Sequence, residues 1–175
     1  MAERVVDVYI GVGSNIEPEA NIAQALELLR QRMPILGVST FYRTRPLGRP
    51  EQPTFLNGAV HVQTGLVPRV LKFDMLRDIE TALGRERTED AYAARRIDLD
   101  ILIYGDLTVD EPHLTIPDTD IYERAFVSMP LLELAPKLVL PDTGRPLSEV
   151  VRDQHPEQLE PALGFTQKMK SRYDE

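Results

Sequence analysis

The fold is decided by one stretch of the sequence, RRIDLDILIYGD at residues 95–106. Read with a period of two residues, this stretch predicts a β-strand over Ile97–Tyr104 with two unlike faces. The apolar face carries Ile97, Leu99, Ile101 and Ile103. The opposite face carries Asp98, Asp100, Leu102 and Tyr104. Burying unpaired carboxylates costs several kcal/mol, so we expect cations or hydrogen-bond donors beside the two aspartates.

The strands and helices predicted before this strand follow one another in an order that is typical of a known fold. Apolar and β-branched runs predict strands over Val5–Gly13, Val38–Thr44 and Phe55–Thr64. Apolar residues at helical spacing predict helices over Ala20–Met33 and Pro68–Leu83. The resulting order, β-α-β-β-α-β, is the ferredoxin-like pattern. It predicts an α+β fold with a mostly antiparallel sheet and both helices packed on one of its faces.

The chain after this core predicts a C-terminal extension. Short elements are expected at 107–110, 114–117, 138–141 and 146–151. A helix over residues 123–135 contains Pro130, which we expect to split it. Residues 152–175 are polar and poorly periodic. We therefore predict a single domain over residues 1–151, followed by a loosely packed tail over residues 152–175.

The composition restricts the classes of protein to which the chain can belong. Its 175 residues include 20 Lys and Arg against 28 Asp and Glu, a formal charge of −8, which argues against nucleic acid or an anionic membrane as a partner. With no cysteine, the chain has no disulfide, no cysteine-ligated zinc and no thiol nucleophile. The sequence has no long apolar run and no signal-like start, so we expect a cytoplasmic protein.

Asp98 and Asp100 admit two interpretations. As hard oxygen ligands they suit one or two Mg²⁺ ions, which usually bind through one or two carboxylates together with substrate phosphates. As structural charges they would instead form salt bridges with Arg95 and Arg96. The spacing of these residues alone leaves both interpretations open.

Residues 85–95 link the second helix to this strand and carry Arg85, Arg87 and Arg95. Arginines on a long loop can close over a polyphosphate and stabilise its charge. A solvated connection is the alternative, and the composition of the loop by itself favours that alternative. No Gly-x-x-x-x-Gly-Lys-Ser/Thr motif is present, so a nucleotide would need another way to hold its phosphates.

Three further residues have the chemistry to hold a flat heterocycle. Phe55 and Asn57 share one face of their predicted strand, and Phe126 comes much later in the chain. Two aromatic rings with an amide nearby can stack against such a ring and hydrogen-bond its edge. A place in the hydrophobic core is the commoner role for phenylalanine.

Together these motifs resemble those of the 6-hydroxymethyl-7,8-dihydropterin pyrophosphokinase family (2-amino-4-hydroxy-6-hydroxymethyldihydropteridine diphosphokinase). In chain order they are GVGSN at 11–15, FYRT-x-PLG at 41–48, FLN at 55–57, GR at 84–85, R-x-x-DLDI at 95–101, LTIP at 114–117, R-x-F at 124–126, PL at 130–131 and AP at 135–136. The resemblance runs from Val8 to about Val151, which is nearly all of the chain before the predicted tail.

The resemblance implies that pyrophosphate passes from ATP to the hydroxymethyl group of 6-hydroxymethyl-7,8-dihydropterin, which releases AMP. It implies that Asp98 and Asp100 hold two Mg²⁺ ions, and that Arg85 and Arg95 are the catalytic arginines. Phosphoryl transfer asks a protein mainly for positioning and charge neutralisation, so no protein nucleophile is required. ATP and the pterin are then the expected partners, and a monomer is the working expectation.

The resemblance also implies which residues bind each substrate. For the pterin they are Thr44, Leu47, Phe55, Asn57 and Phe126. For ATP they are Glu80, Arg87, Ile101, Thr115 and Arg124.

Several positions differ from the family's usual residues. The family's Arg-Trp-Gly-Pro-Arg run reads Ala-Tyr-Ala-Ala-Arg at residues 91–95, so one loop arginine is absent. Asp118 stands where histidine is common, Arg77 where glutamine is common, and Phe55 where tyrosine is frequent. These differences leave two alternatives beside the family's reaction: a pyrophosphokinase for a modified pterin, or a weakly catalytic paralogue that binds pterin or nucleotide.

Overall fold

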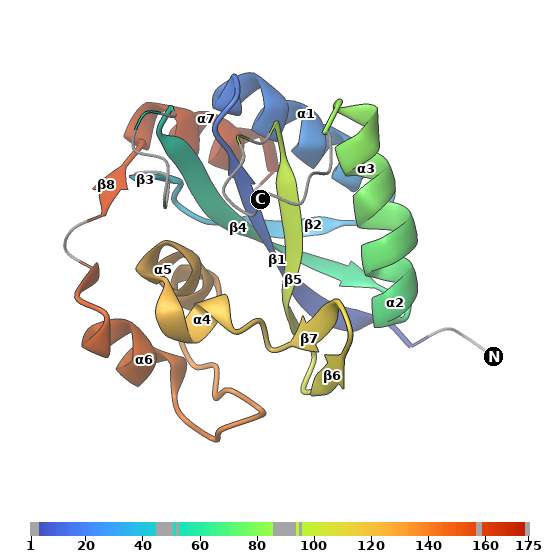
Figure 1. Ribbon diagram of the computed structural model, residues 1–175, viewed down its shortest axis with the longest axis vertical. Helices are drawn as coiled ribbons and strands as arrows, with labels where there is room; N and C mark the ends of the chain where they lie inside the picture. The colour runs from blue at the N-terminus through green and yellow to red at the C-terminus, as the bar shows by residue number, and fades with distance from the viewer. Residues whose placement is uncertain are drawn as a thin grey trace.

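A six-stranded sheet runs through the middle of the computed structural model, which describes residues 4–44, 51, 53–85, 94, 96–156 and 159–173 (Figure 1). Its strands are β1 (Val6–Ser14), β2 (Ile35–Val38), β3 (Tyr42–Thr44), β4 (Phe55–Thr64), β5 (Asp98–Tyr104) and β8 (Glu160–Pro161). Their order is β5-β1-β4-β3-β8, with β2 also paired to β4, and every pairing is antiparallel. The predicted α+β fold and its antiparallel sheet are confirmed.

The second predicted strand is broken into β2 and β3. Between them the hydroxyl of Ser39 accepts a hydrogen bond from the backbone N–H of Ala59 at 2.8 Å. A side chain thus takes a place that a backbone carbonyl takes in a regular ladder. Phe41 follows in the core, packed where a Cβ atom on Gly58 would overlap its ring.

The strict alternation predicted for the deciding strand is wrong at one point. Tyr9 pairs with Ile103 and Ile10 pairs with Ile101, so β5 holds one residue more than β1 here. This β-bulge leaves Leu102 as the extra residue, and a bulge changes the face to which the following side chains point. Ile101 therefore lies in one hydrophobic cluster, whereas Leu102 and Ile103 lie in the other.

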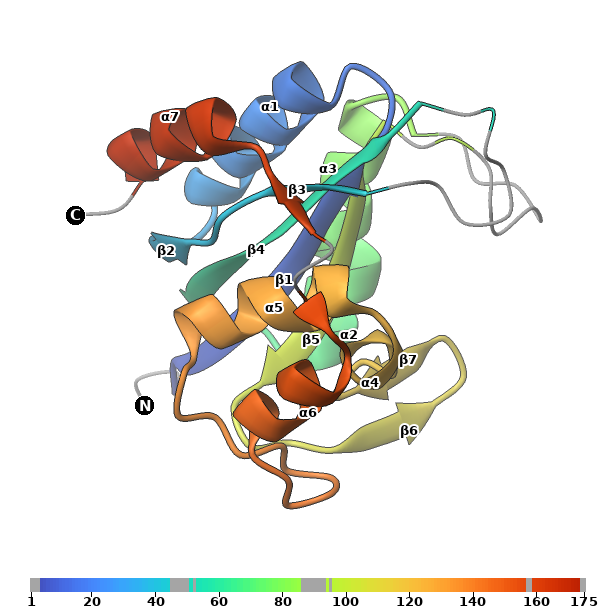
Figure 2. The same cartoon turned by 90° about the vertical axis from the view of Figure 1, so that its left-hand side faces the viewer.

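Helices cover both faces of the sheet (Figure 2). One face carries α1 (Pro18–Arg30), α7 (Leu163–Tyr173) and a continuous helix made of α2 (Pro68–Val70), the π-helical turn η1 (Leu71–Leu76) and α3 (Arg77–Ala82). The other face carries α4 (Asp120–Glu123), α5 (Ala125–Leu134) and α6 (Leu147–Asp153). Each layer buries its own hydrophobic cluster against the sheet. The two helices of the β-α-β-β-α-β core share one face, as predicted.

Pro130 does not split its helix, contrary to expectation. Helix α5 continues through Pro130, and the break from α4 comes at Arg124, whose backbone is extended with φ −129° and ψ 112°. A proline inside a helix removes one backbone hydrogen bond. Packing of α5 against β4 and α6 offsets that loss, because Pro130 and Leu131 are buried there.

The expectation of a loosely packed segment after residue 151 is wrong for Leu163–Tyr173. Helix α7 places Phe165, Met169 and Tyr173 in the main core cluster. The ring of Phe165 lies edge-on to Phe41 with 5.3 Å between centroids. Buried residues four apart are a helical signal, but the intervening residues are polar and the signal was missed.

A two-stranded hairpin of β6 (Val109–Glu111) and β7 (Leu114–Ile116) lies beside β5 and the η1 turn (Figure 1). The two short elements predicted for this region are therefore confirmed with small shifts of their bounds. No helix in the described part of the chain has both the length and the apolar character needed to cross a membrane.

Candidate functional site

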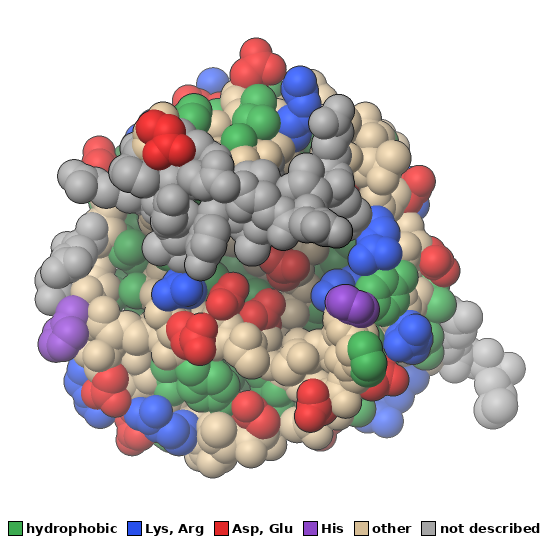
Figure 3. All heavy atoms as spheres, in the orientation of Figure 1, with side chains coloured by type: hydrophobic (Ala, Val, Ile, Leu, Met, Phe, Trp, Pro, Cys, Tyr) green, Lys and Arg blue, Asp and Glu red, His purple; other side chains and the backbone are tan. Residues whose placement is uncertain are grey.

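Two neighbouring cavities meet at the start of β5. The larger, about 330 Å³, lies between the η1–α3 helix and the β6–β7 hairpin. The smaller, about 60 Å³, lies over β1, β4 and the first turn of α5. Asp98, Asp100 and Asp118 line both of them. The space-filling view in Figure 3 shows acidic side chains gathered near the middle of the face turned to the viewer, with basic side chains to either side.

Glycines on β1 leave the space in front of the carboxylates open. Gly13 pairs with Asp98 and Gly11 with Asp100 in the β1–β5 ladder. A Cβ atom on Gly13 would overlap the side-chain oxygen of Asn57, and one on Gly11 would lie 3.2 Å from the side chain of Leu102. The Gly-x-Gly at the end of β1 therefore makes room for side chains that reach in from β4 and β5.

Burial and neighbouring carboxylates raise the pKa values of Asp100 and Asp118. Burial, followed by the charges of Asp98, Asp118 and Glu80, raises the pKa of Asp100 well above its ordinary value, and Lys72 opposes that rise. Burial is also the largest cause that raises the pKa of Asp118, to about 6. Two interacting carboxylates that are both poorly solvated favour proton uptake or a bound cation.

Among the described residues, Arg85 forms a salt bridge with this cluster. Its guanidinium contacts Glu80 and lies 2.8 Å from Asp98. Gly84 just before it has a φ of 86°, which turns the chain at the end of α3 so that the N–H of Arg85 donates to the Glu80 carbonyl. Burial lowers the pKa of Arg85, but the charges of Asp98 and Glu80 outweigh burial and raise it.

Glu80 is 3% exposed and has a structural task besides lining the larger cavity. Its carboxylate accepts a hydrogen bond of 2.9 Å from the N–H of Leu99 on β5. It thus ties α3 to the strand that carries the aspartates, and it holds Arg85 beside them. Of the two arginines considered as salt-bridge partners of the aspartates, Arg96 is exposed and Arg95 lies outside the described residues.

The donor set fits Mg²⁺. Within the described residues no group of three or more His, Cys, Asp or Glu side chains is arranged to hold a metal ion. Mg²⁺ does not need such a cage, since it usually binds through one or two carboxylates and completes its shell with water and substrate phosphates. Asp98 and Asp100, which share a strand face and stand among other carboxylates, supply that kind of ligand.

The predicted pterin residues are brought together in part. Asn57 and Phe126 line the smaller cavity, and the Asn57 amide donates to the Thr44 hydroxyl at 2.7 Å. Phe55 lies two residues before Asn57 on the same face of β4, but it does not line the cavity as the described residues form it. Leu47 lies outside the described residues.

The predicted ATP residues are more scattered. Thr115 on β7 and Glu80 line the larger cavity. The side chain of Ile101 is 4% exposed and packs in the core, and Arg124 lies at the α4–α5 junction, where it lines neither cavity. Arg87, like Arg95, lies outside the described residues.

Sequence reasoning did not predict several residues that line the larger cavity, among them Lys72, Arg77 and Asp118. Lys72 lines it from η1, and no strand or helix pattern marks it, because the π turn changes which residues share a face. Asp118 and Arg77 stood out only as departures from the family's usual residues, and the structure places both in the cavity wall.

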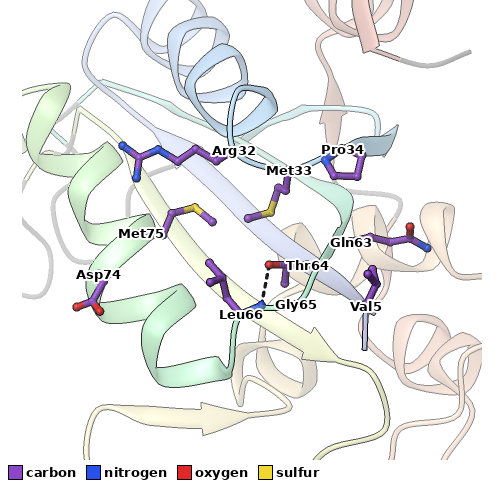
Figure 4. A pocket seen from close by; sticks show the side chains of 10 residues that line it. All are labelled: Val5, Arg32, Met33, Pro34, Gln63, Thr64, Gly65, Leu66, Asp74 and Met75. Carbon is purple, nitrogen blue, oxygen red and sulfur yellow. Dashed lines mark hydrogen bonds between the residues drawn. The ribbon is translucent and has the colours of Figure 1, made fainter. Parts of the chain in front are cut away.

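A further hollow of about 690 Å³ lies at the other end of β1 and β4 (Figure 4). Met33, Leu66 and Met75 are among the residues that line it, and Arg32, which also lines it, pairs with Asp78 at 2.6 Å. It contains none of the residues predicted to bind substrate. The cavities at the start of β5 are therefore the candidate site.

Comparisons with known proteins show the family to which the chain is similar. The model of the family described as 7,8-dihydro-6-hydroxymethylpterin-pyrophosphokinase matches residues 9–136. The 2-amino-4-hydroxy-6-hydroxymethyldihydropteridine pyrophosphokinase of Pseudomonas aeruginosa is 42% identical over 82% of this chain and 89% of that protein. The enzyme of the same name from Haemophilus influenzae is 37% identical over 79% of this chain and 88% of that protein.

The fold also has solved relatives. The Plasmodium falciparum HPPK-DHPS crystal structure with pteroate superimposes with a TM-score of 0.68 at 12% sequence identity. The match covers 99% of this chain and 44% of that one, so this chain spans less than half of the Plasmodium protein. At this identity the likeness shows the fold alone.

Proposed function

The chain belongs to the 7,8-dihydro-6-hydroxymethylpterin-pyrophosphokinase family and is an ATP-dependent pyrophosphokinase of folate biosynthesis, and we propose that its two cavities hold the two substrates. The larger cavity, with three basic side chains and Thr115 in its wall, takes the nucleotide. The smaller cavity, with Asn57 and Phe126, takes the pterin. The observation that carries this division is the wall that the cavities share, formed by Asp98, Asp100 and Asp118.

The shared wall is where the reacting groups of the two substrates meet. The hydroxymethyl oxygen of the pterin attacks the β-phosphorus of ATP, the bond from that phosphorus to the oxygen shared with the α-phosphorus breaks, and AMP leaves with that oxygen. The hydroxyl proton is released. Because the reaction needs alignment and charge neutralisation rather than a protein nucleophile, a wall of carboxylates with a cation fits it.

We assign two Mg²⁺ ions to Asp98 and Asp100. When bound, Mg²⁺ neutralises phosphate charge and orients the phosphate oxygens. Arg85, held 2.8 Å from Asp98 and in contact with Glu80, stabilises negative charge on the group in transfer. Arg95 has the same role by resemblance.

On the pterin side, Asn57 reads the hydrogen-bonding edge of the ring. Its orientation is set by the 2.7 Å hydrogen bond to Thr44 and by Gly13, which leaves room for its amide. Phe126 packs against one face of the heterocycle, and Phe55 packs against the other. We further propose that the enzyme works as a monomer.

AMP release tests the proposal. Protein, ATP, Mg²⁺ and 6-hydroxymethyl-7,8-dihydropterin are incubated, and AMP is followed for wild type and for Asp98→Asn and Asp100→Asn. Each variant should lose about 10²-fold or more in kcat, the scale seen when one group that stabilises transition-state charge is removed. Asp106→Asn, on the exposed turn after β5, is the control and should keep wild-type activity. Activity in the two site variants equal to that of the control would contradict the assignment.

A further inference from the structure

The helix beside the larger cavity contains a π-helical turn. In η1, the backbone N–H of Arg77 donates to the carbonyl of Lys72, five residues earlier. Turns with this hydrogen-bond pattern are rare inside α-helices and are often found at functional sites. The turn lies where the helix passes the cavity, so its geometry decides which side chains face that cavity.

The π turn brings Lys72 and Arg77 to one face. In an α-helix, with 3.6 residues per turn, residues five apart point about 140° away from each other around the axis. The i to i+5 hydrogen bond of a π turn places them one above the other instead. Both side chains accordingly line the same cavity, and both lie near the ring of Phe73, at 5.7 Å for the Lys72 ammonium and 4.9 Å for the Arg77 guanidinium.

Both side chains are half-buried and neither forms a salt bridge among the described residues, although the charge of Lys72 acts on Asp100 and Asp118 from a greater distance. Lys72 donates to the backbone carbonyl of His113 in the β6–β7 turn at 2.6 Å, which leaves two of its three donors for other acceptors. The Arg77 guanidinium lies over the Phe73 ring, and a cation–π contact of this kind uses none of its N–H donors.

The charges of the cavity wall show why two such cations matter. The wall holds the carboxylates of Glu80, Asp98, Asp100 and Asp118. Its third basic residue, Arg85, is already engaged by two of these carboxylates. With Lys72 and Arg77 the wall carries three cations against its four carboxylates, so these two residues offset much of the negative charge that an entering polyphosphate would meet.

We infer that Lys72 and Arg77 form a phosphate-binding pair, presented by the π turn, that holds the triphosphate of the nucleotide from the helix side of the larger cavity. The inference rests on the proposed assignment of this cavity to the nucleotide.

Nucleotide binding without turnover tests the pair. The full-length protein is titrated calorimetrically with α,β-methylene-ATP, with inorganic tripolyphosphate and with AMP, in Mg²⁺ and again in EDTA. Lys72→Gln and Arg77→Gln should each lower the affinity for α,β-methylene-ATP and for tripolyphosphate about tenfold, as expected for loss of a charge-assisted hydrogen bond. The affinity for AMP should fall by about threefold or less. Each variant should also flatten the dependence of log Kd on salt concentration, and Arg77→Lys should restore part of the lost affinity.

Arg69→Gln is the matched control. Arg69 lies on the same helix and over the same ring, at 5.3 Å, but it is exposed, pairs with Glu111 and does not line the cavity. The Arg69→Gln variant should bind all three ligands as tightly as wild type does. If the two cavity variants bind the ATP analogue as tightly as wild type does, the pair does not bind phosphate. The same conclusion follows if their affinity for AMP falls as much as their affinity for tripolyphosphate. If wild type binds no nucleotide at all, the cavity assignment fails and the inference fails with it.

Discussion

Replacing Asp118 by asparagine should stabilise the metal-free protein at neutral pH. Burial and the charges of Asp120 and Asp98 raise the pKa of Asp118 from 3.8 to about 6, although a 2.8 Å hydrogen bond from the N–H of Asp120 works the other way. The folded protein therefore holds a carboxylate that prefers to be protonated. A shift of this size corresponds to about 3 kcal/mol at a pH above both pKa values.

The pH dependence follows from the sign of the shift. Below the unfolded pKa of 3.8 Asp118 is protonated in both states, so it costs nothing. As the pH rises through about 6 the unfolded state loses its proton more readily than the folded state, and the wild type loses stability relative to Asp118→Asn. Asparagine keeps an oxygen that can accept from the N–H of Asp120, so the turn before α4 is retained.

Urea unfolding in EDTA measures the effect. The free energies of unfolding of the two proteins should agree near pH 4 and differ by about 3 kcal/mol near pH 7.5, equivalent to roughly 6–12 °C in Tm for a chain of this size. Asp106→Asn, on the exposed turn, should match wild type at every pH. A difference that is the same at every pH, or a wild type that is the more stable protein near pH 7.5, would refute the reasoning.

Three further substitutions probe the fold and the site. Gly13→Ala should push the amide of Asn57 aside and weaken pterin affinity about tenfold, while calorimetry shows ATP-analogue binding unchanged. Glu80→Ala should leave the buried N–H of Leu99 without its acceptor and cost about 1–3 kcal/mol in urea unfolding, and an unchanged midpoint would contradict its structural role. Phe165→Ala should cost about 3–5 kcal/mol, whereas a freely exposed tail would lose almost nothing.

The sheet could be predicted from the sequence because its strands are long and strongly patterned. β4 has the predicted bounds, Phe55–Thr64, and the order of strands and helices follows from periodicity alone. The errors came where a local interaction overrides the pattern. Neither the Ser39 hydroxyl that ends β2 nor the bulge at Leu102 leaves a mark in the alternation of apolar residues, because each depends on the neighbouring strand.

Some residues of the site could be predicted from the sequence and others could not. The positions of three predicted residues follow from the elements that carry them. Asp98 and Asp100 lie at the start of β5, and Arg85 follows the end of α3 beside them. Lys72 was not predictable, since the face on which it lies is set by a π turn that no helical spacing reveals. Arg124 was assigned by motif alone, and its position at a helix junction depends on packing of the C-terminal layer.

The wall that the two cavities have in common makes the two ligand equilibria inseparable. A ligand that changes the field at Asp98, Asp100 and Asp118 from one side changes the free energy of binding on the other, and by linkage the effect must be reciprocal. If the products lie as proposed, AMP in one cavity changes the affinity of the other cavity for the pterin diphosphate, and the pterin diphosphate changes the affinity for AMP by the same factor.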